Sequence, residues 1–289
     1  MRLGQIKWNG AVTAALFEGG KARPIPGFPL YELLCSAERD GEPVDALASR
    51  LASQTAVVSP PLIPIHPPEV WGCGCTYESS AAFRDAEHGT REGFYAHVYR
   101  DQRPEVFFKG TARVCVGPNE AIGIRSDSQF TAPEPELAVL LGSRGRVIGY
   151  TLANDVSAWD IERQNPLYLT QSKIYRGACA FGPVFVTPDE LGDLRALRMT
   201  CHVERAGRTL FSGEVGLDKL NRTIETLIEY LLRCNPAPAG TVLLTGTGII
   251  ATQEAALAPG DIVTIAIPQI GELRNPAVVM SSDGAEQLC

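Results

Sequence analysis

Two glutamates separated by one residue stand where a proline-rich segment runs into an apolar stretch. Glu134 and Glu136 lie in TAPEPELAVLL, on either side of Pro135. Because proline holds the residue before it in an extended conformation, we expect both carboxylates on one face of a strand entry. Two like charges at the edge of a core are costly unless a cation compensates them. The alternative is a pair of solvated glutamates at a strand end.

A third carboxylate, Asp155, follows the next apolar run, in GYTLANDVSAWDIE. The intervening GSRGRV predicts a hairpin turn, so two antiparallel strands would bring Asp155 beside Glu134 and Glu136. Three carboxylates without a nearby His or Cys indicate a hard cation. Mg2+ fits, Mn2+ or Ca2+ could substitute for it, and zinc does not fit. As the alternative, Asp155 is the N-cap of a helix that begins near Val156.

Two further segments carry charged residues in apolar or glycine-rich surroundings. Lys173 lies in QSKIYRGACAFGP, and Glu105 and Lys109 flank the apolar VFF of RPEVFFKG. A strand or turn at VFF would present both charged groups to one pocket, although a lysine considered alone is usually solvated. The small-residue turn TGTG at 245–248 either holds a carboxylate through its backbone N–H groups or is a plain tight turn.

Composition restricts the classes of protein that this chain can be. Its 289 residues, 45% hydrophobic and 20% charged, are typical of a globular protein that needs no disulfides. None of the eight cysteines forms a CxxC pair, so we expect reduced thiols. No apolar run has membrane-spanning length and no secretory signal pattern opens the chain, so we expect a cytoplasmic protein with no membrane partner. A net charge of -7 without a Lys/Arg block excludes nucleic acid as a partner.

The chain divides at a proline-rich stretch. Residues 1–58 mix short apolar runs with predicted helices at 30–39 and 44–52, which indicates a small N-terminal α/β domain. Five prolines within residues 59–69 impose an extended path and predict a linker. Residues 70–289 would form the second, larger domain.

Short β-like runs punctuated by turn residues fill this larger domain, and they favour a sheet-rich α+β fold. The runs lie at 114–117, 136–142, 146–153, 182–187, 241–246 and 261–267. One helix is predicted over 218–234, where apolar residues recur at the helical period and Asn235-Pro236 ends the pattern.

Taken in order, PEPELAVLL, YTLANDVSAWD, KIYRGACAFGP and TGTG resemble the catalytic domain of the fumarylacetoacetate hydrolase superfamily, over about residues 71–267. VWGCGCTYESS, RPEVFFK and NPLYLTQSKIY are most similar to the branch that dehydrates 2-keto-3-deoxy-D-arabinonate. The resemblance implies a mixed β-sandwich roll as the catalytic domain, a metal held by two glutamates and an aspartate, and a homo-oligomer, either dimer or tetramer.

The resemblance also implies roles for individual residues. The metal ligands fall on Glu134, Glu136 and Asp155. The catalytic positions fall on Glu105, as the acid/base group, and on Lys173, for which a basic role and a charged substrate-holding role both remain open. Thr247 falls on the turn near the substrate carboxylate. Apart from the resemblance, we also expect Arg84, Lys109, Ser79 and Tyr77 to contact the substrate.

One departure from the superfamily pattern bears on the reaction. Hydrolytic and decarboxylating members carry a His-Glu pair on a lid helix, whereas this segment reads TYESSAAFRDAE, with Ser80 near the histidine position. His88 and His97 are close in sequence and are the alternatives for a water-activating base. The missing pair disfavours hydrolysis of a C–C bond and favours chemistry that needs no hydroxide nucleophile.

The expected function is therefore a Mg2+-dependent dehydratase. A small 2-oxo acid would chelate Mg2+, Glu105 would protonate the leaving hydroxyl, and a 2-keto-3-deoxypentonate would give 2,5-dioxopentanoate, also called 2-oxoglutarate semialdehyde. D-arabinonate and D-xylonate catabolism converge on this substrate. The alternatives are an acylpyruvate hydrolase, a 2-oxo acid decarboxylase or a diene-dioate isomerase of the same superfamily, or a non-catalytic metal-binding module.

Overall fold

The fold is given by a computed structural model, which describes residues 1–87 and 93–281. β-Strand is its most frequent regular secondary structure. The strands are β1 (Arg2–Trp8), β2 (Ala11–Glu18), β3 (Lys21–Pro24), β4 (Val70–Gly74), β5 (Glu105–Gly110), β6 (Cys115–Val116), β7 (Ile122–Arg125), β8 (Thr131–Ala132), β9 (Pro135–Leu141), β10 (Val147–Asp155), β11 (Ser157–Ala158), β12 (Cys179–Val186), β13 (Arg198–Arg205), β14 (Arg208–Gly216), β15 (Val242–Leu244), β16 (Ile262–Ile267) and β17 (Gly271–Met280).

Short helices connect these strands. The α-helices are α1 (Leu30–Asp40), α2 (Val44–Leu51), α3 (Glu78–Glu87), α4 (Phe94–Arg100), α5 (Trp159–Gln164), α6 (Leu169–Lys173), α7 (Pro188–Leu191) and α8 (Ile224–Leu232). No helix in the described part of the chain combines the length and the apolar character needed to cross a bilayer.

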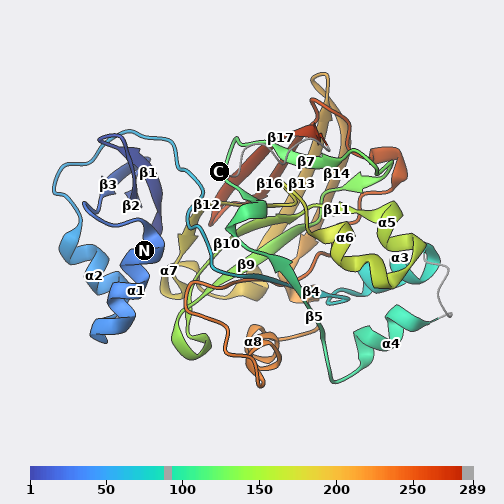
Figure 1. Ribbon diagram of the computed structural model, residues 1–289, viewed down its shortest axis with the longest axis horizontal. Coiled ribbons are helices and arrows are strands. Elements are labelled where there is room, and N and C mark those ends of the chain that lie inside the picture. Colours follow the sequence, from blue (N-terminus) through green and yellow to red (C-terminus); the bar gives the residue numbers. More distant parts are fainter. Residues whose placement is uncertain (88–92, 282–289) are drawn as a thin grey trace.

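Two sheets form the body of the molecule (Figure 1). The larger has the order β3-β2-β1-β12-β10-β9-β15-β4-β5, with β6 also paired to β12, and the smaller has the order β14-β13-β16-β17-β7. One apolar core joins their facing surfaces, with Val139 and Leu152 from the larger sheet and Val203, Ile265 and Leu273 from the smaller. The prediction of a sheet-rich α+β fold with a β-sandwich is confirmed.

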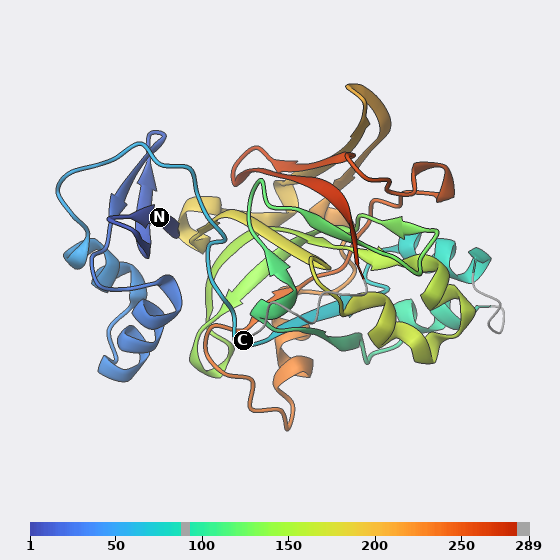
Figure 2. The ribbon, with the colours of Figure 1, turned by 45° about the horizontal axis from the view of Figure 1, so that its top comes forward.

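The N-terminal segment continues the larger sheet. Strand β1 pairs with β12, with Leu3 opposite Phe185, and the helices α1 and α2 pack beside these strands (Figures 1 and 2). Leu33 of α1 shares a core with Phe185 and with Leu140 of β9. The two helices predicted in this segment are confirmed, and the division into domains 1–58 and 70–289 stays a prediction.

The helix predicted over 218–234 is wrong at its N-terminal side. A 3-10 turn covers Leu217–Lys219, and α8 begins only at Ile224. The cap explains the late start, because the Thr223 hydroxyl accepts the backbone N–H of Thr226 at 3.1 Å. The prediction relied only on apolar periodicity, so it included residues before Ile224. The polar side chains of that segment form hydrogen bonds with another part of the chain.

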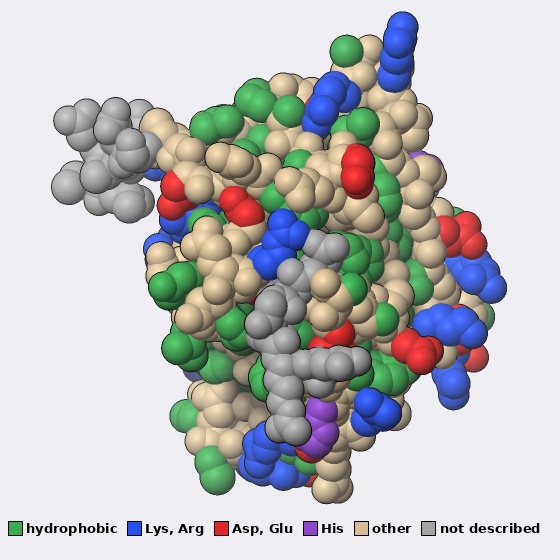
Figure 3. Space-filling view, turned by 90° about the vertical axis from the view of Figure 1, so that its right-hand side faces the viewer, with side chains coloured by type: hydrophobic (Ala, Val, Ile, Leu, Met, Phe, Trp, Pro, Cys, Tyr) green, Lys and Arg blue, Asp and Glu red, His purple; other side chains and the backbone are tan. Residues whose placement is uncertain are grey.

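The hairpin β9–β10 places the acidic residues. Its strands are antiparallel and joined by the turn at 142–146, as GSRGRV predicted, with Glu136 opposite Ala153. β9 is buried along its whole length, which its apolar ELAVLL sequence explains. Helices α3 to α6 gather at the end of the sandwich where this hairpin opens, on the right-hand side of Figure 1. Hydrophobic and charged side chains are mixed over the face that they form (Figure 3).

Candidate metal centre and active site

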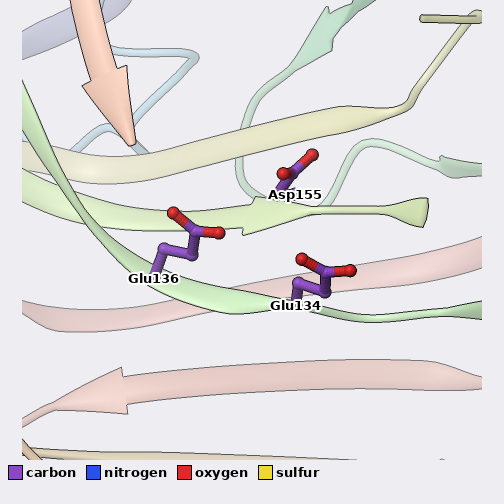
Figure 4. A group of neighbouring side chains, drawn as sticks. All are labelled: Glu134, Glu136 and Asp155. Carbon is purple, nitrogen blue, oxygen red and sulfur yellow. The ribbon is translucent and has the colours of Figure 1, made fainter. Parts of the chain in front are cut away.

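Three carboxylates meet at the open end of the β9–β10 hairpin. Glu134 lies just before β9, Glu136 is the second residue of β9, and Asp155 ends β10. One carboxylate oxygen from each lies within 4.8 Å of the others (Figure 4). All three are buried, with at most 5% of any residue exposed. The alternative of solvated glutamates is therefore wrong, and Asp155 belongs to a strand instead of capping a helix.

Each carboxylate has its own set of donors. Glu134 accepts the Trp159 indole N–H at 2.9 Å and the Lys173 ammonium at 3.0 Å. Lys173 also donates to Oδ2 of Asp155 at 3.0 Å, and Nζ of Lys109 lies 2.5 Å from Oδ1 of Asp155. Two buried lysines therefore contact the cluster, and both converge on Asp155.

Glu136 depends on a backbone donor. Its Oε2 accepts the N–H of Gly246, in the TGTG turn, at 2.5 Å. Gly246 has a φ of 93°, and a Cβ there would collide with the Thr76 hydroxyl, so the turn requires glycine at this position. The N–H group of this turn thus holds a protein carboxylate, which is the role that the sequence allowed as one of two alternatives.

The electrostatics of the cluster are uneven. Burial, together with Asp155 and Glu134, raises the pKa of Glu136 well above its usual range. Burial also acts to raise the pKa of Asp155, but Lys109 and Lys173 outweigh it and lower that pKa. With all three carboxylates ionised, as a bound dication would hold them, the two lysines leave one negative charge uncompensated. A buried, oxygen-only donor set with surplus negative charge fits Mg2+.

Lys173 is completely buried among acidic groups. Burial lowers its pKa, but Asp155 and Glu134 raise it by more, so the pKa lies above the usual range for lysine. Of the two roles left open for Lys173, these contacts support the one in which its ammonium is charged and holds the substrate. A dication at the same carboxylates would take over part of this stabilisation and lower the lysine pKa.

The predicted proton donor, Glu105, begins β5 and its side chain is 24% exposed. Its Oε2 lies 3.2 Å from Nη1 of Arg84, which is almost fully buried in α3. Gly74, opposite Glu105 in the sheet, makes room for this pair, since a Cβ there would collide with the Glu105 carboxylate. Arg84 therefore reaches Glu105, and its predicted contact with substrate stays a prediction.

A cavity of about 230 Å³ opens beside Glu105. Its walls are mostly apolar and come from α4, the start of β5, α5, α6 and the segment between the last two. The lining residues are Phe94, Tyr95, Val98, Glu105, Glu162, Pro166 and Leu169. A larger cavity of about 500 Å³, lined mainly by residues 192–195 and 220–225, contains none of the residues predicted for the site.

The remaining predicted substrate contacts gather around the TGTG turn. The Ser79 hydroxyl donates to the Gly248 carbonyl at 3.1 Å, and the Thr247 hydroxyl donates to the Ile249 carbonyl at 3.1 Å. Tyr77 is buried, burial raises its pKa, and its hydroxyl has no hydrogen-bond partner within the described residues. An unpaired buried hydroxyl is available to a ligand.

Histidine does not supply a base to the centre among the residues that the structure describes. Ser80, at the position of the lid histidine, is buried. The imidazole of His97 is 76% exposed and pairs with Asp101 at 3.4 Å. His88 lies outside the described residues.

Glu162, which the sequence analysis did not select, belongs to the same region. It lies in α5 and its side chain is 2% exposed, with Oε1 3.4 Å from Nη2 of Arg84. Its only sequence signal is its place in WDIE, three residues after the tryptophan that contacts Glu134.

A β-sandwich that carries three acidic residues at the end of a hairpin defines a structural class of protein. Residues 75–278 match the family model "Fumarylacetoacetate (FAA) hydrolase C-terminal", and the chain belongs to this family. It is 50% identical over 216 residues to the 2-dehydro-3-deoxy-D-arabinonate dehydratase of Saccharolobus solfataricus, covering 74% of this chain and 72% of the relative. It is also 40% identical over 238 residues to a protein of Haloferax volcanii named "Probable 2-keto-3-deoxyxylonate dehydratase", covering 80% and 82% of the two chains.

A solved structure extends the similarity to nearly the whole chain. The structure of 2-keto-3-deoxy-D-arabinonate dehydratase complexed with magnesium and 2,5-dioxopentanoate aligns with a TM-score of 0.83 at 38% identity. The alignment covers 97% of this chain and 99% of the other. The expected fold and superfamily are confirmed.

Proposed function

We propose that this protein is a Mg2+-dependent hydro-lyase that converts a 2-keto-3-deoxypentonate into 2,5-dioxopentanoate and water, in the catabolism of pentoses. The observation that carries the proposal is the buried cluster of Glu134, Glu136 and Asp155, in a chain 50% identical to a dehydratase of this substrate class. The same substrate arises from D-arabinonate and from D-xylonate, so either source would feed it.

Charge supports a monoanionic substrate. The cluster with its two lysines carries one surplus negative charge, and Mg2+ would convert this to one surplus positive charge. A 2-oxo acid brings one carboxylate, which would neutralise the buried centre. Neutrality matters because isolated charge in a buried site is expensive.

When bound, Mg2+ supplies a Lewis acid that stabilises negative charge on the oxygen of the substrate ketone. The side chains of the protein supply the remaining roles. Lys173 and Lys109 hold Asp155 in place, and Lys173 also contacts Glu134. Glu105, beside the cavity, donates the proton that converts the C4 hydroxyl into water.

The atoms balance over two stages. A base takes a proton from C3, which is the basic role left open for Lys173, the C4–O bond breaks, and the hydroxyl departs as water with the proton from Glu105. This leaves a 5-hydroxy-2-oxo-3-enoate. The proton taken from C3 passes to solvent, and solvent returns a proton to Glu105. Protons lost from C5 and from the C5 hydroxyl are then replaced by protons added at C3 and C4, which gives the C5 aldehyde of 2,5-dioxopentanoate.

Several expectations remain part of the proposal. Mn2+ or Ca2+ would substitute for Mg2+ because the donor set is all oxygen. Arg84, Lys109, Thr247, Ser79 and Tyr77 would contact the substrate. Three further parts of the proposal rest on the resemblance and the sequence pattern alone. They are a homo-oligomeric state, a cytoplasmic location and the division into domains.

The test is to incubate the purified protein with 2-keto-3-deoxy-D-arabinonate and Mg2+ and to follow the aldehyde as its semicarbazone. We expect product that depends on Mg2+ and disappears with EDTA. Pyruvate release from an acylpyruvate, with no semicarbazone from the sugar acid, would favour the hydrolase alternative. A protein that binds Mg2+ but converts neither compound would be the non-catalytic module.

A further inference from the structure

Arg84 lies between two carboxylates that differ in burial. Nη1 lies 3.2 Å from Glu105 and Nη2 lies 3.4 Å from Glu162. The Glu105 side chain is 24% exposed and faces the cavity, whereas that of Glu162 is 2% exposed. Both carboxylates line this cavity, but the guanidinium has one deeply buried partner in Glu162 and one more exposed partner in Glu105.

The surroundings of Arg84 keep it in this position. Its guanidinium lies over the rings of Tyr95 and Trp159, 5.6 Å and 5.7 Å from their centres. On the far side, Oε2 of Glu162 lies 3.4 Å from the hydroxyl of Ser172, the neighbour of Lys173. A contiguous chain of contacts therefore runs from the helix that carries Lys173 to the predicted proton donor.

A proton donor must carry its proton when the substrate binds. A guanidinium with no other counter-ion would hold the adjacent Glu105 as a carboxylate, because an opposite charge at this distance favours the ionised form. Glu162 supplies that counter-ion. Among the described residues, Cys73 and Cys75 at β4 and Tyr95 of α4 also interact with Glu105, and these three are not cationic. A further cation in this region is Lys173, which acts on Glu162 and Arg84.

We propose that Glu162 is a positioning residue that neutralises Arg84, so that Glu105 is held in place by the guanidinium and still keeps its proton for the leaving hydroxyl. This inference rests on the proposed function and extends it to a residue outside the metal centre. Glu162 does not touch the substrate in this scheme, so it acts on the rate through Arg84 and Glu105.

The test compares Glu162→Gln with the wild-type enzyme in Mg2+ and 2-keto-3-deoxy-D-arabinonate over a range of pH. In the variant Glu105 becomes the main counter-ion of Arg84, with Glu134 acting more weakly, so the falling alkaline limb of kcat should move down by about 1 to 2 pH units. At neutral pH kcat should fall about 10- to 100-fold and recover in part in acid. KM and Mg2+ affinity should stay within about twofold. Glu162→Asp, which keeps the charge, should leave the limb in its wild-type position.

The matched control is Glu229→Gln, which removes one partner of the exposed pair with Arg233 and should leave the profile unchanged. If Glu162→Gln does not fold, the double variant Arg84→Gln/Glu162→Gln leaves no uncompensated buried charge and replaces it in the test. The alkaline limb of kcat for this double variant should lie at the same pH as that of the wild-type enzyme.

Two outcomes would overturn the inference while the proposed function stands. One is a Glu162→Gln enzyme whose limb stays at the wild-type pH, whatever its kcat. The other is a double variant whose limb moves to lower pH. A wild-type protein that forms no semicarbazone contradicts the proposed function itself, and the inference fails with it.

Discussion

Nζ of Lys109 lies 2.5 Å from Oδ1 of Asp155, and neither side chain has appreciable contact with solvent. Lys173 holds the other oxygen of the same carboxylate at 3.0 Å. Asp155 is therefore bracketed by two ammonium groups, while Glu136 accepts a backbone N–H from Gly246. Burial and the two neighbouring carboxylates raise the pKa of Glu136 and outweigh the effect of Lys173, whereas Lys109 and Lys173 together outweigh burial and lower the pKa of Asp155.

Replacing Glu136 with Gln should abolish Mg2+-dependent turnover and leave the fold intact, because it removes a ligand charge and little volume. We expect a loss of about 100-fold or more in Mg2+ affinity, since even outer-shell changes cost about 10- to 100-fold. Calorimetric titration with Mg2+ measures this, with the exposed Glu214→Gln as control. A variant that turns over at the wild-type rate would refute the ligand assignment.

Replacing Glu105 with Gln should separate chemistry from metal binding. The amide cannot donate an acidic proton, so kcat should fall by about 10²- to 10⁴-fold while Mg2+ affinity is unchanged. Steady-state kinetics and titration of Mg2+ on the same sample check both parts. Unchanged kinetics would exclude Glu105 as the proton donor.

Lys109→Met should destabilise the fold by about 3 to 5 kcal/mol, since it removes one partner of a buried ion pair. Added Mg2+ should recover part of this loss, because the dication binds the folded state and replaces the missing positive charge. Urea unfolding with EDTA and with Mg2+ measures both values. Lys219→Met, at an exposed pair, is the control. Equal losses under both conditions would contradict a metal site at Asp155.

Asp261 gives a prediction for stability against pH. Its buried carboxylate accepts two N–H groups of Arg205, each at 2.8 Å. Burial acts to raise its pKa, but these bonds and the Ala258 N–H lower it below the unfolded value. The stabilisation is therefore complete above about pH 4 and is lost as pH falls through the folded pKa.

Asp261→Asn should lower the free energy of unfolding by about 1 to 3 kcal/mol at neutral pH. The difference from wild type should begin to shrink below about pH 4, where the unfolded chain takes up a proton, and should vanish once the pH is below the lowered pKa of the folded carboxyl. Chemical denaturation at several pH values measures it. A difference that stays constant into acid would show that packing, and not charge, stabilises this contact.

The hairpin that carries the acids could be predicted from sequence because its signals are local. An apolar run, a glycine-containing turn and a second apolar run fix both the strands and their register. Glu134, Glu136 and Asp155 follow from that register, since both strands end at the same edge. The N-cap alternative for Asp155 was wrong because β10 extends through Asp155 itself.

The features that the sequence did not predict depend on contacts between distant parts of the chain. Glu162 has no local signal of its role, because its partner Arg84 is 78 residues earlier in the sequence and meets it only through the packing of α3 against α5. The predicted start of α8 was too early for a related reason. Asn221 and Arg222 donate to backbone carbonyls at the end of α4, including that of Tyr99, contacts that periodicity cannot reveal.

The pairing of β1 with β12 affects how the chain can be shortened. Leu3 and Arg2 occupy the positions opposite Phe185 and Val186 on one side of β12, the strand that also pairs with β10 next to the acidic cluster. A fragment beginning at residue 59 would leave the Phe185–Val186 end of β12 without its partner strand, and the freed N–H and C=O groups there would favour edge-to-edge aggregation. The N-terminal strands thus act as a protective cap for the sheet that carries the site.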